Sequence, residues 1–515
     1  MARRIDADAP ALIDRGRAVS HRELASESRR VARGLRELGV RAGDAVAIWM
    51  PNTPAWLAAF LACAQLGAVA VCVNTRFRSH ELADILGRSG ARTLLYWPGF
   101  KGIDFTAILA GCDAASLSGL ETVVAYAEDA AAIPARVGGR RTITYGSLAA
   151  GPELDDDASA PGAGCAVFTT SGTTKAPKFV LHDQRTVLRH AFDVARGFSI
   201  GPDAVLLLAP PLCGVFGFCC ALAAFAAARP TILAPSWDAA QAARDIVAHR
   251  VTHFHATDEA IAQLLQAPGA DFSSVRFCGY AAFNPAQADI VERAGARGLT
   301  LVGLYGASEI QALFARQDES APAAERALAG GRPVSAEARV RARDPESGTV
   351  LPHGTPGELE FLAPGSRMAG YRENPEATRA AFTADGYYRS GDLGYTQDDG
   401  RFVFLTRLGD SLRLGGFLVS PAEIEGVVQE VPGIAACQVV GVARPEGVVP
   451  VAFVLLTPPA RLDEPAAIGH VASRLARYKV PRRVVALDAF PVTSGANATK
   501  IQKTRLREMA EALLH

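Results

Sequence analysis

Short apolar segments alternate with helical patterns over most of this 515-residue chain, and the alternation restricts the folds open to it. A helical pattern opens at Ser20 with capping-box spacing to Glu23 and runs to Leu38. Apolar segments that fit strands lie at 45–49, 68–73, 204–208, around Phe254, at 231–234 and at 299–304, and further helical patterns lie at 55–65 and 239–249. Strands that alternate with helices favour parallel layers. We therefore predict an α/β fold for the larger part of the chain.

The length indicates more than one structural unit, because single hydrophobic cores stop growing well below this size. Residues 151–164 are polar and rich in Gly and Pro, which is typical of a connector between subdomains. Beyond Arg407 the pattern changes to a short module with helices expected at 421–430 and 466–476 and strands at 435–442 and 451–456. We predict a large N-terminal domain of layered α/β subdomains at 1–408 and a small, mobile α+β C-terminal domain at 409–515.

The charge balance excludes some partners. Lys and Arg together equal Asp and Glu at 53 each, so no basic field favours nucleic acid, and a phosphate ligand must be held by local groups. The nine scattered cysteines show no zinc-type spacing and suggest reduced thiols in a cytoplasmic protein. The N-terminus does not match a signal peptide, and the uncharged run 54–73 fits a buried helix and strand better than a membrane span.

A loop rich in glycine and hydroxyl groups, Thr-Thr-Ser-Gly-Thr-Thr-Lys-Ala-Pro-Lys at 169–178, follows the apolar run 165–168. Such a loop can direct backbone N–H groups, hydroxyls and an ammonium at a polyphosphate. It differs from the Walker pattern, because Gly172 precedes Lys178 by six positions and Pro177 intervenes. Taken alone, it also fits an ordinary surface loop.

Further short segments follow this loop in a fixed order. They are Tyr-Gly-Ala-Ser-Glu at 305–309, Ser-Gly-Asp at 390–392, Arg-Leu-Gly-Asp at 407–410, Gly-Gly at 415–416, and Lys500 near the C-terminus. The ordered set resembles the adenylate-forming superfamily of acyl-CoA synthetases, carrier-protein adenylation domains and luciferases, from about residue 11 to residue 506. It is most similar to the acyl-CoA synthetases.

The resemblance implies a reaction and its cofactors. A carboxylic acid and ATP form an acyl-adenylate with Mg²⁺, and the acyl group then passes to the thiol of CoA or of a phosphopantetheine arm. The loop residues implied to hold the β- and γ-phosphates are Thr170, Ser171, Gly172, Thr173, Thr174 and Lys178. Lys175 stands where the family usually has glycine, either adding charge near the phosphates or lying in solvent.

The later segments are implied to hold the rest of ATP. Tyr305 would stack on adenine, and Ser308 would contact the α-phosphate in place of the usual threonine. Glu309 would bind Mg²⁺, which prefers carboxylate and phosphate oxygens. Asp392 would accept hydrogen bonds from the ribose hydroxyls, and Arg407 would reach ribose or phosphate oxygens. A Gly-Asp pair is also ordinary turn chemistry.

The C-terminal segments are implied to provide catalysis and domain motion. Lys500, rather than Lys503, would bridge the carboxylate and the α-phosphate in the transition state. Gly409 stands at the hinge about which the C-terminal domain rotates between the two half-reactions. Gly415 and Gly416 would line the tunnel for the thiol arm, although a β-turn explains them as well.

The acyl pocket departs from the family pattern. Cys213 and Gly214 replace a frequent aromatic-His gate, and residues 210–218 contain no acid that could hold a substrate ammonium, so an amino acid is not expected. Tyr280 could shape the channel, and His255 could orient the carboxylate or simply be a core histidine. Candidate wall residues are Phe216, Phe218, Cys219, His255, Tyr280, Phe283, Gly303 and Leu304. A bulky or cyclic apolar acid is expected.

Other functions remain open at this stage. They are a ligase that loads an acyl carrier protein, a luciferase-like oxidase, and a non-catalytic adenylate-binding protein. We expect a monomer or homodimer that binds no nucleic acid.

Overall fold

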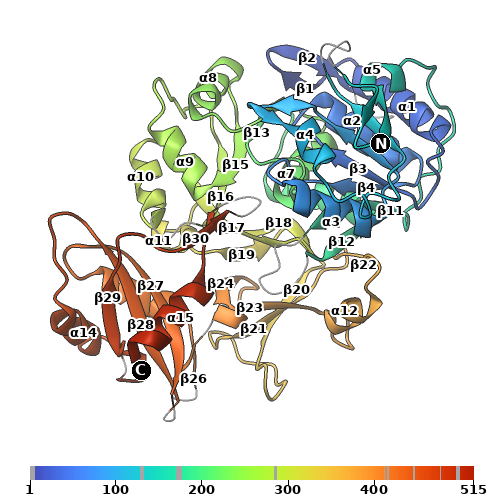
Figure 1. Cartoon of the computed structure of the whole chain (residues 1–515). Coiled ribbons are helices and arrows are strands. Elements are labelled where there is room, and N and C mark those ends of the chain that lie inside the picture. Colours follow the sequence, from blue (N-terminus) through green and yellow to red (C-terminus); the bar gives the residue numbers. More distant parts are fainter. Residues whose placement is uncertain are drawn as a thin grey trace.

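A computed structural model of the chain contains two large β-sheets that share a layer of helices between them (Figure 1). The structure describes residues 6–127, 133–169, 177–283, 287–410, 412–414, 417–444, 447–475, 477–494 and 499–514. Helices also cover the outer face of each sheet, which gives five alternating α and β layers. The layered α/β architecture confirms the predicted fold class.

The first sheet is built mainly from parallel strands. Its order is β22-β12-β11-β4-β3-β5-β8-β10-β9. The strands are β3 (Ala45–Trp49), β4 (Val69–Cys72), β5 (Thr93–Tyr96), β8 (Thr122–Ala125), β9 (Arg136–Val137), β10 (Arg140–Thr144), β11 (Gly164–Thr169), β12 (Phe179–Asp183) and β22 (Gly370–Tyr371). Strand β11 pairs in parallel with β4 and antiparallel with β12, so the glycine- and hydroxyl-rich loop connects two neighbouring strands.

The second sheet changes from parallel to antiparallel pairing at β17. Its order is β2-β1-β14-β13-β15-β16-β17-β18-β19-β24-β23-β21-β20. The strands are β1 (Pro10–Asp14), β2 (Arg17–Ser20), β13 (Leu206–Leu208), β14 (Thr231–Leu233), β15 (His253–Thr257), β16 (Phe277–Ala281), β17 (Leu301–Ala307), β18 (Gln311–Arg316), β19 (Gly330–Pro333), β20 (Arg339–Arg343), β21 (Gly357–Leu362), β23 (Tyr388–Thr396) and β24 (Phe402–Arg407). The ends of β17, β23 and β24 therefore belong to one continuous sheet.

Helices cover both faces of these sheets and bury their apolar side chains. Within β3, Val46 and Ile48 face the shared layer, whereas Ala47 and Trp49 face the outer layer. The shared layer holds α1 (His21–Glu37), α2 (Pro54–Gln65), α6 (Gln184–Gly197) and α7 (Val215–Ala227). The outer layers hold α3 (Ser79–Ser89) and α4 (Phe105–Ala110) on the first sheet, and α8 (Ala239–His249), α9 (Asp258–Leu265) and α10 (Ile290–Ala296) on the second. Shorter elements are β6 (Gly99–Phe100), β7 (Ile103–Asp104), α5 (Tyr145–Leu148), α11 (Ala323–Arg326) and α12 (Pro375–Ala380).

Helix α1 begins at its predicted cap, and α2 begins at Pro54, one residue before the predicted start. Ser20 accepts from the Glu23 N–H at 3.1 Å, and Glu23 Oε2 accepts from the Ser20 N–H at 2.7 Å, so the capping box of α1 is complete. Thr53 caps α2, whose Pro54 occupies the first turn, where no N–H is needed. No helix in the described part of the chain is long and apolar enough to cross a bilayer.

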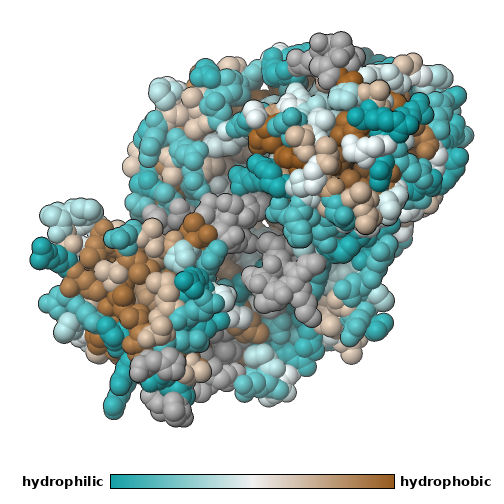
Figure 2. Space-filling view, in the orientation of Figure 1, coloured by the Kyte–Doolittle hydropathy of each residue, from teal (hydrophilic) through white to brown (hydrophobic). Residues whose placement is uncertain are grey.

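A small α+β module follows β24 and lies at the lower left of Figure 1. Its elements are η3 (Leu408–Asp410), β25 (Leu412–Leu414), β26 (Phe417–Val419), α13 (Pro421–Gln429), β27 (Ile434–Arg444), β28 (Gly447–Leu456), α14 (Glu464–Ala472), η4 (Arg477–Lys479), β29 (Arg483–Ala486), β30 (Val492–Ser494), β31 (Thr499–Ile501) and α15 (Lys503–Leu514). Figure 2 shows apolar surface on this module, whose sheet β27-β28-β29 packs apolar side chains on both faces. The exact boundary at 408/409 stays a prediction.

Candidate active site

Tyr305 lies near the end of β17, inside an aromatic cluster. Its hydroxyl donates to Asp392 Oδ2 at 2.5 Å. Its ring stacks against Phe361 with the centroids 5.2 Å apart, and the edge contact with Phe402 is 5.1 Å. The residue therefore connects the 305–309 motif to the 390–392 motif, 87 positions later in the chain. Its predicted stacking on adenine stays a prediction.

Asp392 and Arg407 are register partners on the neighbouring strands β23 and β24. Arg407 Nη1 lies 2.9 Å from Asp392 Oδ1, yet no aligned hydrogen bond reaches that oxygen from any residue that the structure describes. Burial raises the pKa of Asp392 to about 6, against the opposing effects of Arg407 and the Tyr305 hydroxyl. A buried carboxylate oxygen with spare accepting capacity suits a ligand that donates hydrogen bonds.

The turn that carries Asp392 is held from β21. The Ser390 hydroxyl donates to the Leu359 carbonyl at 2.6 Å and accepts from the Asp392 N–H at 3.0 Å. Gly391 adopts φ +67°, and its N–H donates to Glu358 Oε1 at 3.1 Å. Turn chemistry and a binding role are therefore compatible, because the turn fixes where the carboxylate lies.

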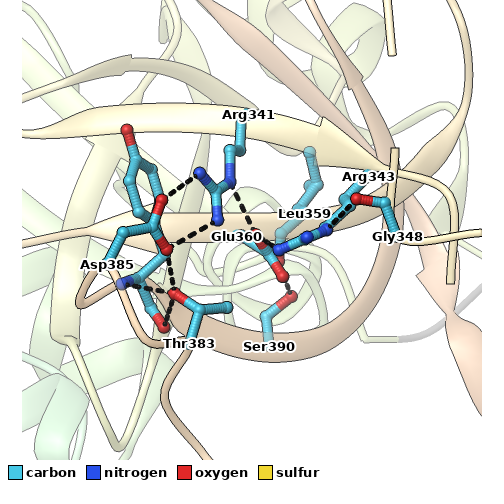
Figure 3. Close-up of polar contacts among 9 residues, drawn as sticks. Arg341, Arg343, Gly348, Leu359, Glu360, Thr383, Asp385 and Ser390 are labelled. Carbon is cyan, nitrogen blue, oxygen red and sulfur yellow. Dashed lines mark hydrogen bonds and ion pairs between the residues drawn. The ribbon is translucent and has the colours of Figure 1, made fainter. Parts of the chain in front are cut away.

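A buried ion-pair network supports this part of β21 (Figure 3). The Glu360 side chain is fully buried, and Arg341 Nε donates to its Oε2 at 2.6 Å. The same guanidinium reaches Asp385 Oδ2 at 2.6 Å and lies 3.8 Å from the Tyr387 ring centroid. Figure 3 shows Leu359, whose carbonyl accepts from Ser390, beside Glu360. The network thus braces the strand against which the Asp392 turn is fixed.

Glu309 and Lys178 each contact Tyr371. The Tyr371 hydroxyl donates to Glu309 Oε1 at 2.8 Å, and Lys178 Nζ lies 4.6 Å from the centroid of the Tyr371 ring. Burial, and then the Glu309 charge, raise the pKa of Tyr371, which therefore stays a proton donor. Tyr371 accordingly contacts both Lys178, at the end of the 169–178 loop, and Glu309, in the 305–309 motif.

This arrangement is compatible with Mg²⁺. The described residues contain no cluster of three or more Asp, Glu, His or Cys that could hold a metal by themselves. Mg²⁺ is usually bound through one or two carboxylates together with substrate phosphates and water. A single carboxylate at Glu309 matches that donor set.

The backbone of the 305–312 segment is held by two buried histidines. His182 Nε2 lies 2.7 Å from the Ser308 carbonyl oxygen, and His190 Nε2 lies 2.7 Å from that of Ala312. A carbonyl only accepts, so each Nε2 carries the proton and donates. Burial lowers the pKa of both histidines to about 4, so both stay neutral near pH 7. The Met368 N–H donates to the Glu309 carbonyl at 2.7 Å and holds the same turn from another side.

The candidate acyl-wall residues divide between the two faces of the second sheet. His255, Leu304 and the half-buried Phe216 lie on the face that packs against the shared helices. Tyr280 lies on the opposite face, and its hydroxyl donates to the Ala327 carbonyl at 2.9 Å. Gly303 faces the same backbone segment, 327–328, because a Cβ at Gly303 would lie 2.0 Å from the Leu328 carbonyl oxygen.

The remaining wall residues differ in exposure. Phe218 is buried in α7 against Phe60 and Phe168, with ring centroids 4.9 and 5.1 Å away. The Cys219 thiol lies 3.8 Å from Gln311 Oε1. Phe283 is 44% exposed, and its N–H donates to Asp258 Oδ2 at 2.8 Å. The residues thus do not form one continuous surface, and their role in acid binding stays a prediction.

The predicted hinge, Gly409, and the predicted catalytic lysine, Lys500, belong to the small module. Gly409 lies within η3, and a Cβ at this position would meet no atom of the described residues within 4 Å. The backbone of Lys500 pairs with Thr493 in the β30–β31 hairpin. Lys503 Nζ lies 3.9 Å from Glu425 Oε1, so Lys503 already has an acidic partner in the module.

Several predicted residues lie outside the described residues. These are Thr170, Ser171, Gly172, Thr173, Thr174, Gly415 and Gly416. Conversely, sequence reasoning missed Tyr371, His182 and Glu358. No local motif marks them, since each reaches the candidate site through contacts between segments that are far apart in the sequence.

Comparison with known proteins identifies the family. The model of the AMP-binding enzyme family matches residues 2–372, and that of the AMP-binding enzyme C-terminal domain matches residues 423–496. The first match covers well over half of the chain.

Curated relatives match along nearly the full length. A Mycobacterium tuberculosis CoA ligase, named for a propanoyl group on a methyl-dioxo-octahydroindenyl ring system, is 32% identical over 98% of this chain and 96% of its own. Feruloyl-CoA synthase from an Amycolatopsis species is 33% identical over 96% of both chains.

A solved structure shows the same fold. ATP-bound MatB from Rhodopseudomonas palustris superposes with a TM-score of 0.82 at 25% identity, over 99% of this chain and 97% of that one. The chain belongs to the AMP-binding enzyme family, within which it is an AMP-forming acid–thiol ligase of the acyl-CoA synthetase type.

Proposed function

We propose that the chain converts a hydrophobic, bulky or cyclic carboxylic acid into its acyl-adenylate with ATP, and then into its CoA thioester with release of AMP. The observation that carries the proposal is the meeting of Tyr305, Asp392 and Arg407, from separate motifs, around one buried carboxylate. Asp392 keeps an oxygen that no described residue reaches with an aligned hydrogen bond, as recognition of a ribose hydroxyl requires.

Each end of ATP has its own group of residues in this proposal. Asp392 and Arg407 hold the ribose, with Tyr305 against the adenine. Lys178 and the loop residues 170–174 hold the β- and γ-phosphates, and Ser308 holds the α-phosphate. Glu309 supports bound Mg²⁺, which would neutralise phosphate charge. Fixed groups of this kind align the carboxylate for in-line attack on the α-phosphorus.

Lys500 neutralises the charge that develops as the acid attacks. The carboxylate and the phosphate are both anionic, so a cation placed between them stabilises the transition state more than the ground state. Lys503 is less suited to this role because it lies near Glu425. The module then rotates about Gly409, and the thiol arm enters past Gly415 and Gly416.

The class of acid is inferred from residues and relatives together. The segment 210–218 provides no carboxylate for a substrate ammonium, and Phe216 and Leu304 are apolar. Two relatives are named for acids that contain rings, one a fused bicycle and the other feruloyl. These observations support a cyclic acid over an amino acid.

The alternative acceptor is the phosphopantetheine arm of a carrier protein. CoA is favoured because the relatives reported above are named as CoA ligase and CoA synthase.

The test is mass spectrometry of reactions that contain ATP, Mg²⁺ and CoA with a panel of fatty, aryl, fused-ring and amino acids. We expect acyl-CoA and AMP with cyclic acids. Acyl-adenylate without thioester would instead point to a carrier protein. Equal rates with straight-chain acids or amino acids would contradict the proposed substrate class.

A further inference from the structure

His255 lies on β15, and one of its ring nitrogens accepts a hydrogen bond from the backbone. The Gly279 N–H, on neighbouring β16, donates to His255 Nδ1 at 3.1 Å. The contact depends on glycine, because a Cβ at Gly279 would lie 2.9 Å from Nδ1 and 2.7 Å from Leu304 Cδ2. Glycine at position 279 thus lets the backbone N–H come close enough to bond to His255 Nδ1.

This contact determines the tautomer. A backbone N–H can only donate, so Nδ1 must be the unprotonated nitrogen. Burial lowers the pKa of His255 to about 3, and the ring is therefore neutral near pH 7. A neutral imidazole with an unprotonated Nδ1 carries its single proton on Nε2, so Nε2–H is a donor.

His255 differs from the other buried histidines in whether its ring N–H has a hydrogen-bond partner among the described residues. His253 bonds through both nitrogens, to Thr252 Oγ1 at 2.8 Å and to the Phe198 carbonyl at 3.0 Å. His182 and His190 donate to carbonyls, and each keeps a fully enclosed, unpaired Nδ1. His255 bonds through Nδ1 alone among the described residues, and its Nε2 has no hydrogen bond to any of them.

The exposed part of His255 is small. The residue retains 2% exposure, and none of the described residues forms a hydrogen bond with Nε2. The ring adjoins Leu304 on the face of the sheet that packs against α6 and α7. A donor left without a partner at such a depth is costly, whereas a ligand oxygen would satisfy it.

We propose that His255 Nε2–H recognises an uncharged oxygen on the acyl body of the acid, such as a ring ketone, ether or hydroxyl. The inference rests on the proposed function, and it narrows the substrate class to cyclic acids that carry such an acceptor. A neutral imidazole provides no countercharge, so the reacting carboxylate is the less suitable partner. His255 is thus a specificity residue.

The experiment compares matched acids. One acid is a propanoic acid on a fused bicyclic diketone, and its partner carries methylenes in place of both ketones. A second pair is ferulic acid and cinnamic acid. With the wild type, kcat/KM should favour the oxygenated member of at least one pair by roughly ten- to hundredfold. In His255→Phe this ratio should fall close to one.

Two further variants separate recognition from folding. His253→Phe removes a buried histidine on the same strand and face whose nitrogens are both paired, and it should keep the wild-type ratio. His255→Gln can accept from Gly279 and donate from its amide, so it should recover part of the preference. In the wild type, ¹⁵N NMR should show the Nε2–H tautomer at pH 7, with its signal shifted by the oxygenated acid.

The outcomes distinguish this inference from the proposed function. Turnover of both members of every pair at similar rates overturns the role of His255 alone. An equal loss on both members in His255→Phe also overturns it, because it indicates contact with the carboxylate common to both. No thioester from any acid of the panel refutes the proposed function, and this inference with it.

Discussion

At the scale of single residues, Asp392 is buried, and the proposed contact with ribose requires its charged form. Its Oδ2 accepts from Tyr305, and its Oδ1 faces Arg407, but burial outweighs both contacts and raises its pKa to about 6. Burial therefore moves the titration of this carboxyl into a range that an ordinary assay can reach.

Nucleoside binding should weaken as the pH falls through about 6, the pKa of Asp392. This is an acid with a raised pKa, so its charged form dominates above that value and is lost progressively below it. Calorimetry with adenosine, which lacks phosphates that titrate in the same range, should show several-fold weaker binding at pH 5 than at pH 7.5. Asp392→Asn should bind weakly with little change between the two pH values. An unchanged pH dependence in this variant would exclude Asp392 as the responsible group.

Lys500→Ala should reduce ATP–pyrophosphate exchange by roughly a hundred- to a thousandfold, because the cation between two anionic reactants is lost. Thioester formation from a synthetic acyl-adenylate should be affected much less. The matched control is Lys503→Ala, which removes the ammonium near Glu425 and should lower Tm while most of the exchange rate is retained. Full exchange activity in Lys500→Ala would refute the assignment.

At the scale of elements, the turn between β17 and β18 is held by distant parts of the chain. His182 comes from β12, which lies next to the edge strand β22 of the first sheet, and it holds the Ser308 carbonyl of the second sheet. The Gln311 amide donates to the Thr186 carbonyl of α6 at 3.1 Å and to the Ser366 carbonyl at 3.3 Å. The motif geometry therefore depends on how the two sheets pack together.

His182→Ala should lower the adenylation rate by roughly tenfold and stability by about 1–3 kcal/mol, because the Ser308 carbonyl loses its buried donor. His182→Gln, whose amide nitrogen can replace Nε2, should recover part of both. His190→Ala removes a similar bond, to Ala312, and should lower stability comparably with less effect on the rate. Urea unfolding together with kcat and KM for ATP would separate the two. Equal rate losses in both alanine variants would argue for a purely structural role of His182.

At the scale of the whole molecule, the connection between the large layers and the small module passes through η3. No atom of the described part of the chain lies within 4 Å of where a Gly409 Cβ would be, and the φ of Gly409 is not in the left-handed region. Neither the packing nor the backbone conformation of the described residues requires glycine at position 409. Its backbone freedom is therefore best explained by the proposed rotation of the small module.

Gly409→Pro should retain adenylation and lose thioester formation, because a fixed φ restricts rotation of the module. Gly409→Ala is the matched control and should keep both half-reactions within a few-fold, since the methyl group would meet none of the residues that the structure describes. Pyrophosphate exchange and acyl transfer from preformed adenylate report the two steps separately. Equal loss of both activities in the proline variant would exclude a selective hinge role.

Much of the architecture was predictable because it depends on local signals. Apolar runs such as β3 are buried on both faces, and the Ser20–Glu23 capping box fixes the start of α1. Helix α8 spans the predicted residues, whereas β15 extends from the single predicted Phe254 to five residues. Strand limits were harder to predict because they are set by pairing with neighbours.

The sequence by itself determined the layered α/β class, the small C-terminal module and the family, because hydrophobic periodicity and ordered motifs are local properties of a chain. Only the tertiary structure decided which side chains meet: Tyr371 with Glu309, His182 with the Ser308 carbonyl, and Tyr280 on the opposite face from His255. Such contacts depend on sheet order, register and strand face, and these are fixed by packing of segments far apart in the chain.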